Sequence, residues 1–380
     1  MMMNTTKLIL LITTFVWVNQ TYAQYQSIHF DGHNRTYLVH LPTEYTEATD
    51  LPLLIAMHGG FGNAYSMQNL SQLSDKADAE NFIVVYPEGI EGGPFNISSW
   101  NAGWCCGWSS RNDIDDVGFI NALLDSLIDD YAIDTQRIYA TGMSNGGFMA
   151  YRLACELSDR IAAIAPVSAS MSMNACNTER PVPVISFHSY QDTNIPSNGG
   201  IGSGASKHHN PSQDSILNVW SNNNSCSSTS DTLVKNAEYT LVQWSDCDCG
   251  TKIHHYITED GGHTWPLGDA TSNYIHATDS MWLFLEQFSL DCPASPILSL
   301  DDLPNDFVNV FPNPTSGFLK VNVDISYQHI NISIYNFLGE KILDARDRTR
   351  FNLRRFPTGT YSMVISLDHQ IKTSKVVKIK

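Results

Sequence analysis

Gly142-Met-Ser-Asn-Gly-Gly147 is the stretch that decides the fold, because it places Ser144 in a Gly-x-Ser-x-Gly frame between two kinds of secondary structure. Residues 137–141 before it are typical of a β-strand, and residues 148–154 after it are typical of a helix. A strand that turns sharply into a helix needs small flanking residues, which the glycines of the frame supply. The alternative is an ordinary Gly-Ser turn, but this position between strand and helix predicts a nucleophilic serine.

Short apolar runs alternate with helical patterns along most of the chain. The patterns predict a hairpin over residues 26–40, a helix over 69–80, a second helix with Asp116 as its N-cap, and buried strands over 51–57, 81–86, 137–141, 161–167, 182–188 and 253–258. Buried strands that alternate with helices predict a mostly parallel sheet with both faces covered. The predicted fold class is therefore α/β.

In such a sheet the functional loops lie at the carboxyl ends of the strands. One of these loops is His58-Gly-Gly-Phe-Gly62, whose glycines leave backbone N–H groups accessible. The backbone amides of Gly60 and Asn145 are therefore candidates for an oxyanion hole beside Ser144. A glycine turn that binds nothing is the alternative interpretation of the first loop.

Two further loops contain an acid and a base. Asp192 follows the strand predicted over 182–188, and His263 lies in a glycine-flanked loop after the strand predicted over 253–258. The order Ser144, Asp192, His263 is that of α/β-hydrolases, with His263 as the general base and Asp192 as the residue that orients it. Other side chains compete for these two roles: Asp246, Asp248, Asp260, His58, His188, His208, His209, His254, His255 and His276.

Charge and the N-terminus indicate where the protein acts. The 380-residue chain has a formal net charge of -17, which argues against nucleic acid and an anionic membrane surface as partners because both would be repelled. Residues 1–23 combine Lys7, an apolar run and a Thr-x-Ala cleavage signal, as in a secretory signal peptide. We therefore expect an exported protein that has no membrane span in its mature form.

Export favours disulfides over metal binding for the cysteines, which are Cys105, Cys106, Cys155, Cys176, Cys226, Cys247, Cys249 and Cys292. The vicinal pair at 105–106 and the pair at 247 and 249 also suggest a metal site, but neither has the spacing of a zinc ribbon. A bridge from Cys226 to Cys247 or Cys249 is the local pairing that we expect.

The composition changes near the C-terminus. Residues 291–304 are predicted to form a linker, and residues 305–380 contain short alternating strands over 319–323, 330–335, 361–365 and 373–379. Turn signals separate these strands, so the sequence predicts a small β-sandwich. Two roles are open for it: a module that adsorbs to carbohydrate or polyester, or a sorting domain for export.

Several separated motifs resemble one known family. They are His58-Gly-Gly, Trp100-Asn-Ala-Gly, Cys105-Cys106-Gly107, Asp113-Ile-Asp-Asp-Val-Gly-Phe119, Ala140-Thr-Gly-Met-Ser-Asn-Gly-Gly147, Tyr151-Arg-Leu-Ala-Cys-Glu156 and Gly261-Gly-His-Thr-Trp-Pro266. Together they are similar to the secreted esterases that include feruloyl and acetyl xylan esterases and polyhydroxybutyrate-depolymerase-like proteins. The resemblance implies an α/β-hydrolase fold over residues 24–290, a triad of Ser144, Asp192 and His263, ester hydrolysis through an acyl-enzyme, and no metal or organic cofactor.

The substrate stays open within this resemblance. Polyester depolymerases of this type often carry cysteine at the position of Gly60, and this departure favours esters of plant polysaccharide, such as feruloyl or acetyl groups. The alternatives are a polyester or its oligomers, and a carbohydrate-binding protein that has lost turnover. Trp100, Trp104, Trp108 and Trp265 offer flat apolar faces for an aromatic acyl group or a sugar. Trp265 is the expected substrate contact because it follows His263 so closely.

The C-terminal unit resembles the sorting domain of the type IX secretion system. The resemblance rests on Phe311-Pro-Asn-Pro314, a Tyr-x-Phe-Leu-Gly motif ending at Gly339 and a tail that ends in lysine. It implies that residues 305–380 bind the secretion machinery and direct the protein to the cell surface or the medium. We therefore expect an extracellular serine esterase.

Overall fold

The computed structural model describes residues 24–173, 175–204, 207–269, 272–291, 308–323, 330–335, 341–367 and 370–379. The chain divides into two compact units, residues 1–292 and 293–380, and each is described by itself. The predicted signal peptide, 1–23, and nearly all of the predicted linker, 291–304, lie outside the described residues. None of the described helices is long and apolar enough to cross a membrane.

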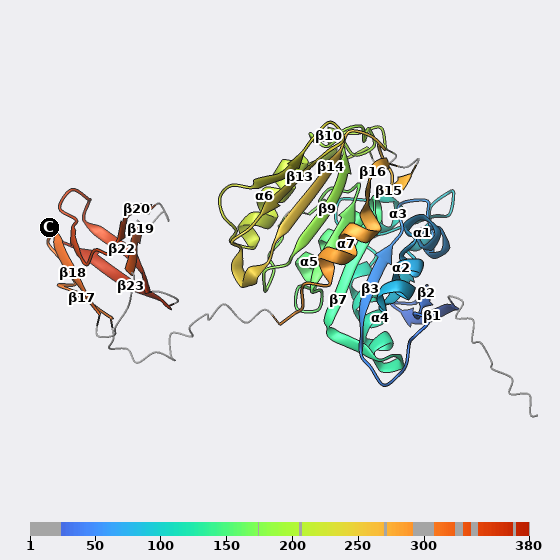
Figure 1. Cartoon of the computed structure of the whole chain (residues 1–380), viewed down its shortest axis with the longest axis horizontal. Coiled ribbons are helices and arrows are strands. Elements are labelled where there is room, and N and C mark those ends of the chain that lie inside the picture. Colours follow the sequence, from blue (N-terminus) through green and yellow to red (C-terminus); the bar gives the residue numbers. More distant parts are fainter. Residues whose placement is uncertain are drawn as a thin grey trace, which may run out of the picture. The chain divides into compact units, whose positions relative to one another are not determined.

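A ten-stranded sheet forms the centre of the first unit, in the order β1-β2-β4-β3-β7-β8-β9-β14-β13-β12 (Figure 1). Its six middle strands, from β4 to β14, run parallel, and the strands outside them pair antiparallel. The strands are β1 Gln24–Phe30, β2 His33–His40, β3 Leu51–Met57, β4 Ile83–Pro87, β7 Ile133–Met143, β8 Ala163–Val167, β9 Val184–Ser189, β12 Asp231–Lys235, β13 Tyr239–Trp244 and β14 Ile253–Thr258.

Helices cover both faces of this sheet (Figure 1). One face packs against α4 Asp116–Asp130, α5 Asn145–Glu156 and α6 Gln213–Asn223. The other packs against α1 Ala64–Ser71, α2 Leu73–Glu80 and α7 Ala277–Leu285. Shorter elements lie in the loops: β5 Ile90–Gly92, β6 Ile97–Ser99, α3 Gly107–Arg111, β10 Gly200–Ile201, β11 His209–Asn210, a 3₁₀ turn at Asp248–Gly250, β15 Leu267–Asp269 and β16 Ser272–His276.

Strand β3 illustrates why the predicted α/β class is confirmed. Every residue of this strand is buried, with Leu53, Ile55 and Met57 in the core under one face and Leu54 and Ala56 in the core under the other. Side chains of a strand alternate between the two faces of a sheet, so a continuous apolar run requires cover on both. The sheet is that of an α/β-hydrolase fold.

Two predicted helix details are corrected. The helix predicted over 69–80 is divided into α1 and α2 by Gln72, whose backbone is left-handed with a φ of 54°. The N-cap of α4 is Asp115, whose side chain accepts the Gly118 N–H, and not Asp116. Asp116 is fully buried and forms an ion pair of 2.7 Å with Arg35. Asp116 is the first residue of the helix, and its side chain pairs with this arginine.

Disulfides join the cysteines as expected in an exported protein. The bridges are Cys105–Cys106, Cys155–Cys176 and Cys226–Cys247, and Cys249 is disulfide-bonded as well. The prediction that Cys226 pairs with Cys247 or Cys249 is therefore confirmed for Cys247.

The second unit consists of two antiparallel sheets that share one apolar core. The first sheet contains β17 Val308–Phe311, β18 Phe318–Val323 and β21 Arg350–Asn352. The second contains β19 Ile330–Tyr335, β20 Lys341–Arg346, β22 Gly359–Leu367 and β23 Gln370–Lys378. Leu319 and Phe351 from one sheet pack in the same cluster as Ile332 and Met363 from the other, so the predicted sandwich is present.

Candidate active site

Four loops that follow parallel strands carry the predicted site residues. Gly60 follows β3, Ser144 follows β7, Asp192 follows β9 and His263 follows β14. The carboxyl ends of parallel strands lie at one edge of the sheet, which brings loops far apart in the sequence together.

Ser144 lies on a sharp turn between β7 and α5. Its φ of 53° and ψ of -122° are unusual for a residue with a side chain. Gly142 and Gly146 make this turn sterically feasible: a Cβ at Gly142 would lie 2.7 Å from Met57 O, and one at Gly146 would lie 2.6 Å from His58 O. The two glycines therefore permit the strand and helix to pass β3 closely, which exposes the Ser144 hydroxyl.

The three residues predicted as a triad are in contact. His263 Nε2 lies 3.0 Å from Ser144 Oγ, and His263 Nδ1 lies 2.8 Å from Asp192 Oδ2. An ionised carboxylate only accepts hydrogen bonds, so Nδ1–H donates to Asp192 and Nε2 is left to accept the serine proton. The carboxylate of Asp192 is fully buried, whereas the His263 ring is 18% exposed and reaches the cavity.

Backbone amides hold Asp192 independently of the histidine. Its Oδ1 accepts the N–H groups of Asn194 and Ile195, both at 2.9 Å. The rival acid Asp260 instead accepts the hydroxyl of Ser272 at 2.6 Å. Asp192 is therefore positioned before His263 binds to it.

Two rival histidines have structural partners. His58 Nδ1 donates to Gly59 O at 2.7 Å and its Nε2 accepts the Gly89 N–H at 3.0 Å, while burial lowers its pKa to about 4. His188 Nε2 donates to Ile195 O at 2.8 Å, and burial lowers its pKa too. Both rings are neutral at pH 7, and their hydrogen bonds stabilise the loops around the site.

Gly60 and Asn145, whose backbone N–H groups are the predicted oxyanion donors, line the same cavity as Ser144. Neither donates a hydrogen bond within the part of the chain that the structure describes, whereas the Phe61 N–H donates to Ser98 O. The Asn145 side chain fixes its own backbone: Oδ1 accepts the Trp100 N–H at 2.7 Å and Nδ2 donates to Trp100 O at 3.0 Å. The two amides are therefore available to a substrate oxygen.

The cavity around Ser144 has a volume of about 490 Å³. Four aromatic residues are part of its lining: Phe148 and Trp108, and also Phe61 and Phe95, which are exposed to solvent at 69% and 84%. A cavity of this size accommodates a ligand larger than an acetyl group.

The expectation that Trp265 contacts substrate is wrong. Its side chain is fully buried in the core under α7, and its Nε1–H donates to Thr278 Oγ1 at 2.9 Å. It is absent from the described residues that line the cavity. Although Trp265 is close to His263 in sequence, the chain turns back into the core directly after the catalytic loop. Of the four tryptophans considered, Trp108 lines the cavity.

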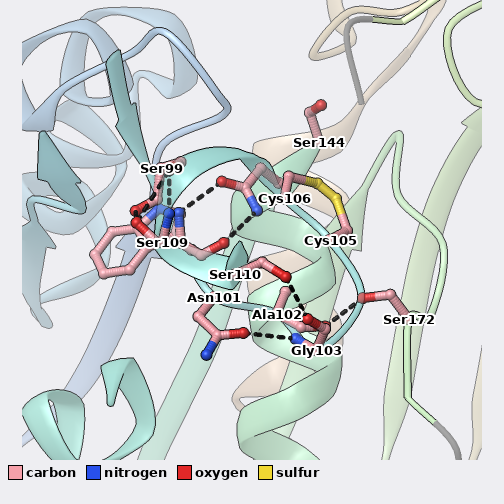
Figure 2. Close-up of a disulfide and its surroundings, with 12 residues drawn as sticks. Ser99, Asn101, Ala102, Gly103, Cys105, Cys106, Ser109, Ser110, Ser144 and Ser172 are labelled. Atoms are coloured by element: carbon pink, nitrogen blue, oxygen red, sulfur yellow. Dashed lines mark hydrogen bonds between the residues drawn. A yellow bond between two sulfur atoms is a disulfide. The ribbon is translucent and has the colours of Figure 1, made fainter. Parts of the chain in front are cut away.

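The loop from Ser99 to Ser110 adds a feature that the sequence did not place at the site. Its vicinal disulfide, Cys105–Cys106, lines the cavity, and Figure 2 shows it close to Ser144. Serine side chains fasten the loop: Ser109 Oγ donates to Ser99 O at 2.7 Å, Ser110 Oγ to Gly103 O at 2.6 Å, and Ser172 Oγ to Ala102 O (Figure 2).

Cys105, Cys106 and His208 lie close enough to form a metal-binding group among the described residues. Both sulfurs, however, are bonded to each other, and a metal requires thiolates. The adjacent cysteines were visible in the sequence, but their place in the cavity wall depends on the tertiary structure.

Comparison with known proteins identifies the second unit first. Residues 309–380 match the model of the secretion system C-terminal sorting domain. The chain therefore carries an export signal at its C-terminus and is an extracellular or cell-surface protein.

The first unit is similar to esterases of fungi. It is 27% identical over 260 residues to the bifunctional acetylxylan esterase/xylanase XynS20E of Neocallimastix patriciarum and 29% identical over 263 residues to feruloyl esterase B of Piromyces equi. These alignments cover 68% and 67% of this chain but only 34% and 46% of the two relatives. Feruloyl esterase C of Emericella nidulans is 26% identical over 256 residues, which are 66% of this chain and 83% of that protein.

Among solved structures, the acetyl xylan esterase from Aspergillus awamori matches with a TM-score of 0.48 and 15% identity, over 69% of this chain and 98% of that one. The model of the putative esterase family matches residues 29–266, which include the Ser144 turn, Asp192 and His263. This match spans more than half of the sequence, so the chain belongs to the putative esterase family.

Proposed function

We propose that the protein is a serine carboxylic ester hydrolase that removes feruloyl or acetyl groups from plant polysaccharide through an acyl-enzyme. The observation that carries the proposal is the chain of hydrogen bonds from Ser144 through His263 to the buried Asp192. Its geometry is the one that converts a weakly nucleophilic hydroxyl into an attacking group.

Acylation would proceed in two proton transfers. Ser144 Oγ attacks the ester carbonyl carbon while His263 Nε2 takes the hydroxyl proton, and Asp192 stabilises the imidazolium that forms. The negative charge on the carbonyl oxygen is stabilised by the N–H groups of Gly60 and Asn145. The tetrahedral intermediate then breaks its bond to the alcohol oxygen, which takes the proton from His263 and leaves.

Deacylation repeats these steps with water. His263 takes a proton from a water molecule as it attacks the acyl carbon, and the bond to Ser144 Oγ breaks. The proton returns to the serine and the free acid leaves. No atom of the enzyme is consumed, and each turnover uses one water molecule.

The substrate assignment is supported by the shape of the cavity and by the relatives. The volume of about 490 Å³ and the aromatic walls suit a flat acyl group such as feruloyl, because stacked rings bury apolar area at a favourable geometry. The names of the similar proteins include acetylxylan and feruloyl esterases.

The test compares three substrates side by side: methyl ferulate, acetylated xylan and hydroxybutyrate oligomers. We expect wild-type protein to hydrolyse at least one of the first two, and Ser144→Ala to lose this activity while its circular dichroism spectrum is unchanged. Hydrolysis of the hydroxybutyrate oligomers alone would replace the polysaccharide assignment with a polyester substrate. Full activity of Ser144→Ala would contradict the serine mechanism.

A further inference from the structure

Arg111 is a charged residue in the cavity wall that the proposed reaction does not use. It ends α3, the helix that follows the vicinal disulfide, and it lines the cavity with Trp108, Ser144 and His263. The described lining contains no lysine, aspartate or glutamate. Since a guanidinium is positively charged at any physiological pH, Arg111 gives this wall a permanent positive charge.

The other arginines of the first unit are all engaged. The unit contains six, namely Arg35, Arg111, Arg137, Arg152, Arg160 and Arg180. Four bind a carboxylate, and Arg180 donates to backbone carbonyls. Within the described residues, no hydrogen bond or ion pair is formed by the side chain of Arg111. In a chain with a formal net charge of -17, Arg111 thus differs from the other arginines of this unit, whose side chains all have partners.

The surrounding structure holds α3 at the cavity. The Trp108 ring packs so closely on Gly92 that a Cβ at that position would overlap it. Ser109 is bonded to Ser99 through its side chain and Ser110 to Gly103, and the disulfide closes the turn before the helix (Figure 2). These contacts hold the helix at the cavity, while the Arg111 side chain at its end is exposed.

We propose that Arg111 binds a carboxylate carried by the substrate, so that the enzyme prefers esters with an acidic group, the chemistry of polysaccharides that contain uronic acids. The inference rests on the proposed esterase function and adds a charge to its substrate. A guanidinium matches a carboxylate through two parallel hydrogen bonds. A neutral acyl or sugar group gives it no comparable partner.

Two pairs of chromogenic esters test the proposal and locate the carboxylate. For the acyl side the pair is the para-nitrophenyl monoester of succinate and para-nitrophenyl butyrate; for the alcohol side it is para-nitrophenyl acetate with and without a ring carboxylate. In each pair we compare kcat/KM for the acidic ester with kcat/KM for the neutral ester. We expect Arg111→Gln to lower this ratio about three- to tenfold in one pair or both, which is the size of effect that a partly exposed ion pair gives. Added salt should lower the ratio in wild-type protein more than in Arg111→Gln.

Arg137→Gln is the matched control, since it removes the same charge from an arginine that is paired with Asp134 and lies outside the lining. In Arg137→Gln the ratio of kcat/KM for the acidic ester to that for the neutral ester should equal the wild-type ratio. In Arg111→Lys, which keeps the positive charge, the ratio should lie between those of the wild-type protein and Arg111→Gln. A ratio in Arg111→Gln that equals the wild-type ratio in both pairs would overturn the proposal.

A binding measurement separates this inference from the proposed function. Ser144→Ala and the double variant Ser144→Ala/Arg111→Gln are each titrated by calorimetry with the succinate monoester and with the acetate ester that carries a ring carboxylate. For at least one of these ligands, the Kd should be about three- to tenfold lower in the protein that retains Arg111. If wild-type protein hydrolysed no ester but this difference persisted, the esterase proposal would fail and the carboxylate site would stand. Equal Kd values with Arg111 and Gln for both ligands would overturn the site.

Discussion

Ser144, His263 and Asp192 illustrate how single residues from three loops become one chemical unit. Asp192 is bound by two backbone N–H groups and by His263, so its carboxylate stays in place even when the histidine ring moves. The histidine is thereby held in the tautomer that leaves Nε2 free for the serine proton.

Replacing Asp192 with Asn tests the role of the tautomer. The Asn oxygen can still accept the N–H groups of Asn194 and Ile195, but its NH₂ group would face His263 and favour the wrong tautomer. We expect Asp192→Asn to lower kcat about 10³- to 10⁴-fold with little change in KM. Steady-state kinetics with para-nitrophenyl acetate measure this, and a kcat above a tenth of the wild-type value would show that Asp192 does not orient the base.

Asn145 allows a prediction with a close internal control. Its side chain pairs with the buried N–H and C=O of Trp100, as that of Asn224 pairs with Val182. Either Asn→Ala change should lower the free energy of unfolding by about 1–3 kcal/mol, because buried backbone groups lose their partners. Only Asn145→Ala should also reduce kcat of the folded protein, by about tenfold or more, because it loosens an oxyanion donor.

Urea unfolding and steady-state kinetics on the two variants check this prediction. An equal kcat for Asn145→Ala and Asn224→Ala would mean that the Trp100 contact serves stability alone.

At the scale of residues, the sequence predicted three side chains that the structure brings into contact, namely Ser144, Asp192 and His263. A serine or histidine flanked by glycines has a recognisable local reason for its position. Asp192 was predicted from its place after a strand, but its rival Asp260 also follows one, and it is the structure that places Asp192 against His263. Trp265 was predicted wrongly because proximity in sequence does not determine which way a side chain points. Arg111 and the Cys105–Cys106 disulfide were not predicted at the cavity, since only the folded loop brings them there.

Among the elements, β7 and α5 cross β3 at very close range. The backbone atoms of Gly142, Gly146 and Met57 come too close for any Cβ between them. The strand-to-helix turn is therefore sterically specified by glycine, as the motif suggested.

Gly146→Ala should destabilise the protein strongly, by about 2–4 kcal/mol, because its methyl group would meet backbone that cannot move aside. Gly60→Ala is the control, since no atom lies within 4 Å of the position of its Cβ. Thermal unfolding of the two variants measures the difference. A Tm for Gly146→Ala equal to that of Gly60→Ala would show that the crossing has room to relax.

Element boundaries were less predictable than element types. Helical spacing continues across Gln72, so the sequence did not show that the chain turns left-handed there. The sequence predicted Asp116 as the N-cap, whereas Asp115 caps the helix and Asp116 pairs with Arg35, which is distant in the sequence. Local patterns cannot reveal a partner of this kind.

For the whole molecule, buried histidines contribute to the response to acid. Burial lowers the pKa of His58 to about 4 and that of His255 to about 3. Both values lie below that of an unfolded histidine, so the unfolded chain binds more protons between pH 4 and 6.5. The stability that these groups contribute is complete above about pH 6.5 and is lost as the pH falls toward 4.

We expect each of these two histidines to reduce the free energy of unfolding by about 2 kcal/mol between pH 7 and pH 5. The variant His255→Gln, which removes one titrating group, should show a correspondingly smaller pH dependence. Urea unfolding at pH 5, 6 and 7 measures how steeply the free energy of unfolding changes with pH in the wild-type protein and in the variant. Identical slopes in the wild-type protein and the variant would contradict the assignment of a depressed pKa to His255.

The organisation of the whole chain was visible in its composition and motifs. The catalytic and sorting parts each resembled a known family, and both families match the chain over those regions. The substrate was not predictable, because it depends on loops whose side chains meet only in the folded protein.

Labelling with a fluorophosphonate tests the central claim, that Ser144 is the nucleophile, most directly. The serine oxygen would displace fluoride from phosphorus and form a stable adduct, which mass spectrometry detects in the intact protein and maps to a peptide. We expect one adduct per chain, on the peptide that contains Ser144, and none in Ser144→Ala. An adduct on another residue, or labelling of Ser144→Ala equal to that of the wild-type protein, would contradict the account.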